Sequence, residues 1–242
     1  MNRKIGMFDS GIGGLSILNV MKDVLPNEDY IYYADSINCP YGNKNIDELI
    51  SITSNIVDYL IEQDVKIIVI ACNTATTKCM KILKEKYPDM LFVGTVPAIK
   101  VASDNNYKNT LVMATPGTIS SERTMELVRD NKKEDQNIYL VSCDGLAEAI
   151  ENKDDVAIDT ILNNIYLEYK DKNIDSIVLG CTHYPFVKDK ILKYFDVDLL
   201  DGSIGVSRQV QRLLKNNNLL NDSGNGTVTM INSLEDVKSH IN

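Results

Sequence analysis

The feature that most constrains the fold is a strand-like segment that occurs twice and ends each time in a cysteine. IIVIACNTAT covers residues 67–76 and SIVLGCTHYP covers residues 176–185, so Cys72 and Cys181 each follow a short apolar run. Runs of β-branched residues without polar alternation are typical of strands that are buried on both faces of a parallel sheet. The repeat predicts two such strands, each carrying a thiol at its carboxyl end.

A second element is also repeated. FDSGIGG begins at Phe8 and ATPGTISS begins at Ala114, and each precedes one cysteine segment by a similar stretch of chain. The two halves are therefore interpreted as duplicated lobes. Because ligands bind at the carboxyl ends of parallel strands, the two thiols are expected to face each other across one cleft. Two opposed thiols can take a proton from one face of a carbon and return it to the other, which inverts a stereocentre.

The other cysteines carry no such repeat. Free cysteine usually behaves as a small buried hydrophobic side chain, and we assign that role to Cys39, Cys79 and Cys143. For Cys72 and Cys181 a chemical role is favoured, because the polar residues after each thiol are duplicated as well. Cysteines without disulfide-like spacing, in a chain that starts with neither a signal peptide nor a cleavage site, indicate a reducing, cytoplasmic location.

Strand-like and helix-like segments alternate along the chain. The strand candidates are Lys4–Phe8, Tyr30–Ala34, Lys66–Ala71, Thr110–Ala114, Ile138–Val141, Ser176–Gly180, Val197–Leu200 and Thr227–Ile231. Helices are expected over residues 15–25, 45–60, 154–170 and 187–195, and a short one after the last strand. Such alternation predicts an α/β fold with two pseudo-symmetric, doubly wound lobes, parallel sheets and a cleft between the lobes. Residues 1–93 with 206–242 would form the first lobe and residues 94–205 the second.

Charge and hydropathy exclude two kinds of partner. The net charge is −9 and no cluster of Lys and Arg is present, whereas nucleic-acid binding depends on many cationic contacts to phosphates. No segment approaches the roughly 20 apolar residues of a membrane-spanning helix. We therefore expect a small-molecule ligand, and neither nucleic acid nor a membrane as partner.

The polar residues beside the thiols suit an anionic ligand. Neutral donors follow the predicted strands at Ser10, Asn73, Thr74, Thr76, Thr115, Thr118 and Thr182. The glycine turn at residues 10–14 adds backbone N–H groups before a helix, and it is not a dinucleotide fingerprint, because Ser16 stands where a third glycine is needed. His183 lies two residues after Cys181 and can orient or activate that thiol. No metal-ligand cluster or cofactor-binding lysine is evident, so no cofactor is expected.

Six motifs occur in order along the chain: FDSGIGG, DSINCPYG, ACNTAT, GTVPAI, ATPGT and LGCTHYP. Their order and spacing resemble those of the glutamate racemases, a cofactor-independent family of the aspartate/glutamate racemase superfamily. The matched blocks run from Phe8 to about Asp201. The resemblance implies interconversion of L- and D-glutamate, a role in supplying D-glutamate for peptidoglycan, and a homodimer.

The resemblance also implies roles for individual residues. Cys72 would take the Cα proton of D-glutamate with help from Asp9, and Cys181 would take that of L-glutamate with help from His183. The positions that match substrate-binding residues are Asp9, Ser10, Tyr41, Gly42, Asn73, Thr74, Thr76, Thr115, Thr118, Thr182 and His183.

Some positions depart from the pattern of the family. A glutamate is expected to support the histidine. Asp144 replaces the usual proline after Cys143; counting from Cys143 gives Glu151 as the supporting residue, and Glu148 is a competing choice. Thr124 stands where a tyrosine is common, and residues 201–203 reverse the usual Ser-Gly order. These changes would affect a helix seam, an oligomer interface or a loop.

Two other classes of function remain possible from the sequence. One is a different enzyme of the superfamily, such as an aspartate or hydantoin racemase or an arylmalonate-type decarboxylase, against which FDSGIGG and CPYG favour glutamate. The other is a non-catalytic protein that binds an acidic amino acid. The presence of Cys72, Cys181, Asp9 and His183 argues against a binding protein, which needs no pair of opposed thiols.

Overall fold

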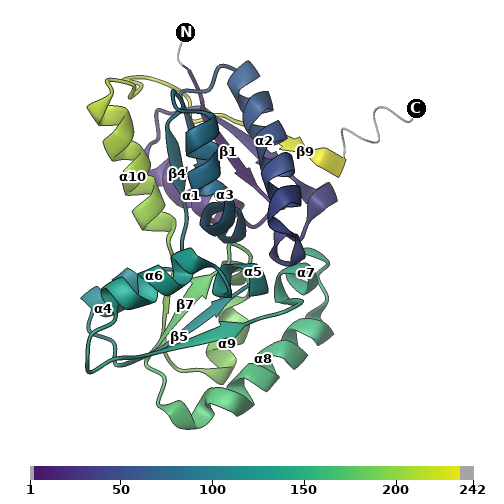
Figure 1. Ribbon diagram of the computed structural model, residues 1–242, viewed down its shortest axis with the longest axis vertical. Coiled ribbons are helices and arrows are strands. Elements are labelled where there is room, and N and C mark those ends of the chain that lie inside the picture. Colours follow the sequence, from purple (N-terminus) through teal and green to yellow (C-terminus); the bar gives the residue numbers. More distant parts are fainter. Residues whose placement is uncertain (1–2, 235–242) are drawn as a thin grey trace.

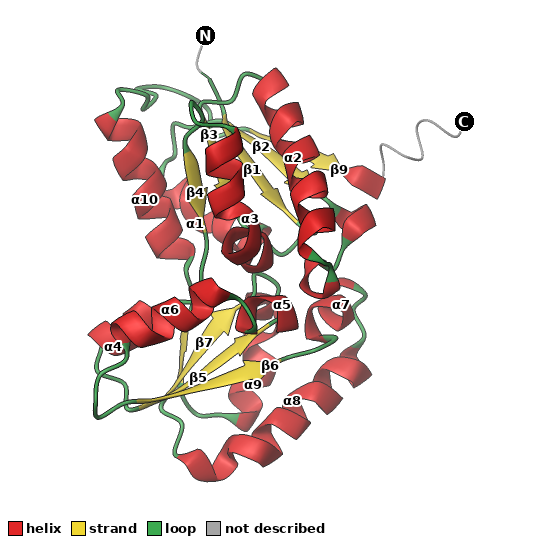
Figure 2. Ribbon diagram, viewed as in Figure 1, coloured by secondary structure: helices red, strands yellow, loops and turns green. Residues whose placement is uncertain are grey.

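The computed structural model describes residues 3–234 and consists of two stacked lobes, each built around a parallel sheet (Figure 1). Helices flank both sheets, and loops join the lobes at a central junction (Figure 2). The predicted α/β fold with two parallel sheets is confirmed. Among the described residues, no helix is long and apolar enough to cross a membrane.

The first lobe combines the beginning and the end of the described chain. Its elements are β1 (Ile5–Asp9), α1 (Leu15–Val24), β2 (Tyr30–Ala34), η1 (Ser36–Asn38), η2 (Tyr41–Asn43), α2 (Ile46–Glu62), β3 (Ile67–Ile70), α3 (Asn73–Lys86), β4 (Phe92–Gly94), α10 (Ser203–Asn216) and β9 (Val228–Asn232). The strand order is β4-β3-β1-β2-β9, and every neighbouring pair is parallel.

The second lobe comes from the middle of the chain. Its elements are α4 (Ile99–Asp104), β5 (Asn109–Ala114), α5 (Pro116–Ile119), α6 (Glu122–Asn131), β6 (Asn137–Ser142), α7 (Leu146–Glu151), α8 (Asp155–Tyr169), η3 (Lys170–Lys172), β7 (Ser176–Gly180), η4 (Tyr184–Val187), α9 (Lys188–Tyr194) and β8 (Asp198–Leu200). The strand order in its sheet is β6-β5-β7-β8, and every neighbouring pair is again parallel.

Burial on both faces explains why the central strands are apolar without alternation. In β3, Ile67 and Val69 pack with α1 and α10 on one face, whereas Ile68 and Ile70 pack with α2 and α3 on the other. The second sheet is covered in the same way, by α7, α8 and α9 on one face and by α4 and α6 on the other. The cysteine strands therefore lie in the middle of two cores.

Most predicted elements are present, with differences at the ends. The strand β4 was not predicted, and α10 begins at Ser203, so the lobe boundary expected near residue 205 falls within its first turn. Asn45 caps α2 through a hydrogen bond donated by the backbone N–H of Glu48 (2.9 Å), and the Glu48 carboxylate accepts a hydrogen bond from Nζ of Lys44 (2.6 Å). The short helix expected after β9 falls largely on residues beyond 234, outside the described chain.

Candidate active site

The two cysteine strands end at the junction between the lobes. β3 lies beside β1, and β7 lies beside β5. Each cysteine therefore lies next to the end of the strand that leads into the second repeated element, FDSGIGG after β1 and ATPGTISS after β5. Cys72 is the residue immediately before α3, and Cys181 follows β7 directly. Each cysteine is only 6% exposed.

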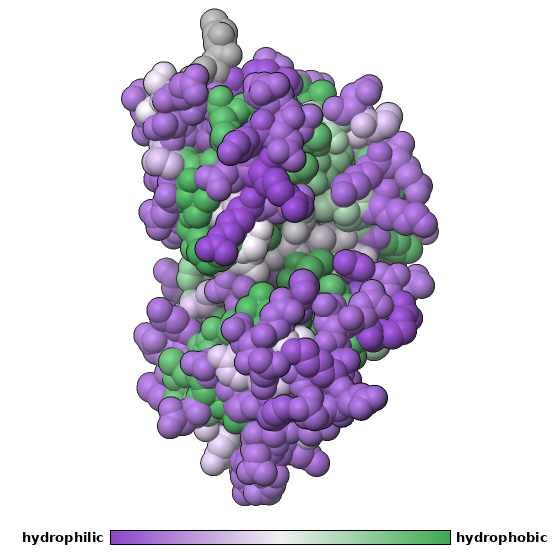
Figure 3. Space-filling model, turned by 90° about the vertical axis from the view of Figure 1, so that its left-hand side faces the viewer, coloured by the Kyte–Doolittle hydropathy of each residue, from purple (hydrophilic) through white to green (hydrophobic). Residues whose placement is uncertain are grey.

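Both thiols line one cavity of about 10 Å³, which is room for about one water molecule. Its walls come from both lobes and consist of Ser10, Pro40, Tyr41, Gly42, Cys72, Asn73, Thr74, Thr115, Ala147, Cys181, Thr182 and His183. The side of the molecule that carries α10 and α4 is mostly hydrophilic, apolar residues are spread over both lobes, and pale residues of intermediate hydropathy gather where the lobes meet (Figure 3).

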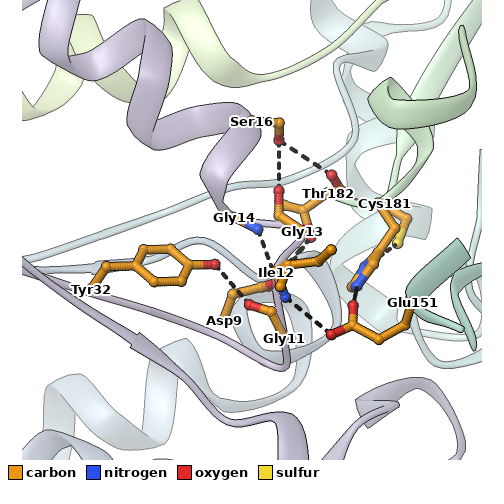
Figure 4. Close-up of polar contacts among 11 residues, drawn as sticks. Asp9, Gly11, Ile12, Gly13, Gly14, Ser16, Tyr32, Glu151, Cys181 and Thr182 are labelled. Atoms are coloured by element: carbon orange, nitrogen blue, oxygen red, sulfur yellow. Dashed lines mark hydrogen bonds and ion pairs between the residues drawn. The ribbon is translucent and has the colours of Figure 1, made fainter. Parts of the chain in front are cut away.

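Cys181 is the first member of a chain of three polar groups. Its Sγ lies 3.8 Å from Nδ1 of His183, and Nε2 of the same ring lies 2.6 Å from Oε2 of Glu151 (Figure 4). Burial is the largest influence on the pKa of His183 and lowers it, but the contacts with Cys181 and Glu151, together with the charge of Asp9, raise the pKa well above 6.5. The structure places Glu151 at this ring, whereas Glu148 is exposed.

Cys72 has a carboxylate neighbour. Asp9 is fully buried at the end of β1, and burial raises its pKa, although the charge of His183 acts in the opposite direction. Burial also raises the pKa of the Cys72 thiol well above its usual value, and the charge of Asp9 adds to this effect. The backbone N–H groups of Ala75 and Thr74, at the start of α3, partly oppose it.

A cluster of hydroxyl groups joins the lobes on one side of the cavity. Oγ1 of Thr74, at the start of α3, lies 2.8 Å from Oγ1 of Thr115 and 3.2 Å from Oγ1 of Thr118. The Thr115 and Thr118 hydroxyls are 3.1 Å apart. Beside them, the buried Oδ1 of Asn73 has no hydrogen-bond partner among the described residues. These neutral groups can bind a carboxylate without adding charge.

Two residues predicted to bind substrate use their hydroxyl groups elsewhere. Thr76 does not line the cavity, and its Oγ1 donates a hydrogen bond to the carbonyl oxygen of Ile70 (3.1 Å). Tyr41 lines the cavity, but its hydroxyl donates to Oδ2 of Asp35 (2.6 Å). Asp9 and Thr118 do not line the cavity either, but each contacts a residue that does, Thr182 and Thr74 respectively. The remaining predicted positions line it: Ser10, Gly42, Asn73, Thr74, Thr115, Thr182 and His183.

The glycine turn holds carboxylates that belong to the protein itself. The backbone N–H of Gly14 donates to Oδ2 of Asp9 (3.0 Å), and that of Ile12 donates to Oε1 of Glu151 (3.4 Å), as Figure 4 shows. The turn also allows close packing, because a Cβ on Gly13 would lie 2.7 Å from Nδ1 of His183. The glycine pattern predicted an anion site at this turn but did not indicate these partners.

One residue near the site was assigned a purely structural role from the sequence. Cys39, in the loop between η1 and η2, lies close to His183 and Glu151. Its position immediately before the pair Pro40-Tyr41, within the motif DSINCPYG, was the only sequence signal that placed it near the cavity.

Known proteins are similar to this chain in sequence and in architecture over most of its length. Residues 15–205 match the Asp/Glu/Hydantoin racemase family. A glutamate racemase of Clostridium novyi is 44% identical, covering 96% of this chain and 91% of the relative. The structure of glutamate racemase from Francisella tularensis in complex with D-glutamate has a TM-score of 0.82 and 33% identity, covering 96% of this chain and 88% of the other. The Escherichia coli glutamate racemase in complex with L-glutamate and the activator UDP-MurNAc-Ala has a TM-score of 0.79 and 32% identity, covering 88% and 83%. This chain belongs to the Asp/Glu/Hydantoin racemase family, among its glutamate racemases.

Proposed function

We propose that this protein interconverts L- and D-glutamate by transferring the Cα proton between Cys72 and Cys181 without a cofactor. The observation that carries the proposal is the cavity shared by the two thiols, each of which ends a strand of a different sheet. The glutamate racemases to which the chain is similar include structures with D-glutamate and with L-glutamate. The substrate would lie between the thiols, with one on each face of its Cα atom.

In the direction from L- to D-glutamate, the Cys181 thiolate removes the Cα proton and the Cys72 thiol donates its own proton to the opposite face. Cys181 ends as a thiol and Cys72 as a thiolate, and the reverse reaction exchanges these roles. The charge that develops on the substrate carboxylate is met by the neutral donors of Thr74, Thr115 and Asn73. Donors fixed in advance in a site that excludes water stabilise such charge more effectively than water does.

The two thiols would be activated in different ways. The imidazole of His183, which Glu151 holds in place, supports the thiolate of Cys181 by positive charge and hydrogen bonding. At Cys72, burial and the charge of Asp9 favour the protonated thiol. The ammonium group of a bound substrate would bring a positive charge next to both groups, and a nearby opposite charge favours the ionised form. Substrate binding itself would therefore lower the pKa of Cys72.

Entry of the substrate requires the lobes to separate. The open space between the thiols holds about one water molecule. The hydrogen bonds from Thr182 to Asp9 and from Ile12 to Glu151 cross from one lobe to the other, as do the threonine contacts. We place the division at residues 1–93 with 206–242 and at residues 94–205. The part of α10 from Val206 onward moves with the first lobe because it packs against α1.

The proposed cellular role is the one expected for a member of this family. A glutamate racemase of this kind would work in the cytoplasm, as a homodimer, and supply D-glutamate for peptidoglycan. The net charge of −9 supports a role without nucleic acid.

The decisive experiment follows L-glutamate and L-aspartate by circular dichroism in deuterated buffer, with no added cofactor. We expect loss of optical activity and deuterium at Cα for glutamate. Absence of both changes would contradict the proposed racemase activity. A preference for aspartate would contradict only the assignment of glutamate as the substrate.

Single substitutions then test the assignment of the thiols. Cys181→Ser should stop racemisation but still exchange the Cα proton of D-glutamate, and Cys72→Ser should do the same for L-glutamate. Cys79→Ser, at a buried thiol outside the cavity, is the control and should racemise normally. Normal turnover in either active-site variant would contradict the two-thiol mechanism.

A further inference from the structure

Cys39 lies beside two potential metal ligands that belong to the other lobe. Its Sγ, a carboxylate oxygen of Glu151 and a ring nitrogen of His183 all lie within 4.8 Å of one another. Cys39 is partly exposed, the Glu151 side chain is 19% exposed and that of His183 is 2% exposed. The group can therefore be reached from solvent through Cys39, while its far side is buried.

We propose that Cys39, Glu151 and His183 form a binding site for a thiophilic divalent cation, for which Zn²⁺ is the best match. Thiolate, imidazole and carboxylate are the three ligand types that zinc uses, and three protein ligands with one open position form a recognised zinc arrangement. Mg²⁺ and Ca²⁺ prefer oxygen ligands only, so this donor set selects against them.

The geometry needs only small movements. Zinc bonds of about 2.0–2.3 Å in a tetrahedral arrangement place ligand atoms roughly 3.3–3.8 Å apart. The three donor atoms lie within 4.8 Å of one another, so shifts of about 1 Å would bring the most distant ones to this spacing. The contact of 2.6 Å between His183 and Glu151 would widen as the cation replaces the shared proton.

Protons and charges balance in this step. The cation takes one lone pair each from the Cys39 sulfur, a carboxylate oxygen of Glu151 and Nε2 of His183. The Cys39 proton and the Nε2 proton both go to solvent, and the imidazole keeps its Nδ1 proton, on the side of Cys181. The carboxylates of Glu151 and Asp9 place negative charge beside Cys39, and that charge attracts a divalent cation.

Bound metal would inhibit the enzyme. The cation would hold His183 and Glu151, so these residues could no longer stabilise the Cys181 thiolate. It would also link the loop that carries Cys39, in the first lobe, to the second lobe, and so oppose the separation of the lobes that lets substrate enter. This consequence rests on the proposed function, but binding of the cation does not. Cys39 has no part in the proposed proton transfer, so its substitution separates inhibition from catalysis.

The first test measures Zn²⁺ affinity for the full chain by competition with a chromophoric chelator. We expect one Zn²⁺ per chain, an affinity lower by at least about tenfold in Cys39→Ala, and no change in Cys79→Ala, which removes a thiol outside the site. Co²⁺ should give thiolate charge-transfer absorption in the wild-type protein and in Cys79→Ala, and not in Cys39→Ala. Equal affinity and an equal Co²⁺ spectrum in Cys39→Ala would overturn the proposal.

The second test measures racemisation. Metal-free Cys39→Ala should turn over as the wild type does, and at least about tenfold more Zn²⁺ should be needed to inhibit it by half. Equal inhibition would show that the inhibitory cation binds Cys72 and Cys181 instead, which contradicts the proposed site. If the wild-type protein does not racemise glutamate, the proposed function fails, and the chelator and Co²⁺ measurements still decide whether the metal site exists.

Discussion

Glu151 contacts His183 with one carboxylate oxygen and the first lobe with the other. Oε2 lies 2.6 Å from Nε2 of His183, and Oε1 accepts a hydrogen bond from the backbone N–H of Ile12 (3.4 Å). A charge-assisted contact of this length holds an imidazole ring in a fixed orientation. The orientation of the ring beside Cys181 is thus coupled to the closed arrangement of the two lobes.

Glu151→Gln should impair racemisation by at least about tenfold, because the imidazole loses the charge that supports its protonated form. Removing that charge lowers the pKa of His183, since Glu151 is one of the groups that raise it. Any limb of the pH–rate profile that reports loss of the imidazolium should therefore move to lower pH. Glu148→Gln is the matched control, and a larger effect there would reverse the assignment.

Gly13→Ala should lower kcat/KM by about 100-fold, because small displacements of catalytic groups have large effects on rate. The added Cβ would lie 2.5 Å from Oγ1 of Thr182 and 2.7 Å from Nδ1 of His183, so both side chains must move. Gly205→Ala is the control, since nothing lies within 4 Å of its Cβ position in α10. There we expect normal activity and about 0.5–1 kcal/mol of added stability. Equal kinetics for the two variants would contradict the packing argument.

Lys66→Met should reduce the free energy of unfolding by about 3–5 kcal/mol, as measured in urea, because it leaves a buried carboxylate without its partner. Nζ of Lys66 lies 2.6 Å from Oε2 of Glu28, and the two side chains are 2% and 1% exposed. Lys100→Met breaks an exposed pair with Asp104 and should change stability by less than about 1 kcal/mol. A double variant, Glu28→Gln with Lys66→Met, should recover part of the loss. Similar stability in Lys66→Met and Lys100→Met would show that the buried pair is unimportant.

Asp9→Asn should abolish most activity yet stabilise the fold near neutral pH. Burial raises the pKa of Asp9 above 3.8, so its ionised form is less favourable in the folded protein than in the unfolded chain. This penalty is absent below the pKa of the unfolded chain and grows as pH rises through the folded pKa. Urea unfolding should therefore show a gain at about pH 7 that shrinks towards about pH 4. A loss of stability at neutral pH would contradict this account.

Local sequence patterns were sufficient for most of the fold. The central strands are apolar on both faces, and this pattern is visible over four to six residues. β4 has only three residues, Phe92–Gly94, too few to show a pattern of its own. Its place was decided by pairing with β3, a contact between residues far apart in the chain.

The choice between Glu148 and Glu151 shows where the sequence is insufficient. Residues three positions apart on a helix lie on neighbouring parts of one face, so both carboxylates of α7 were plausible partners for His183. Only the packing of α7 against the turn after β7 places Glu151 at the ring and leaves Glu148 in solvent.

The sequence by itself determined the two parallel sheets, the strand ends that carry Cys72 and Cys181, and the polar residues that follow them, because all of these depend on periodicity and turn residues over short segments. The tertiary structure decided which groups meet across the junction. The hydrogen bond from Thr182 to Asp9, the position of Glu151 and the approach of Cys39 to His183 arise only when the two lobes pack together. Such contacts join residues that are distant along the chain and leave no local pattern from which they could be predicted.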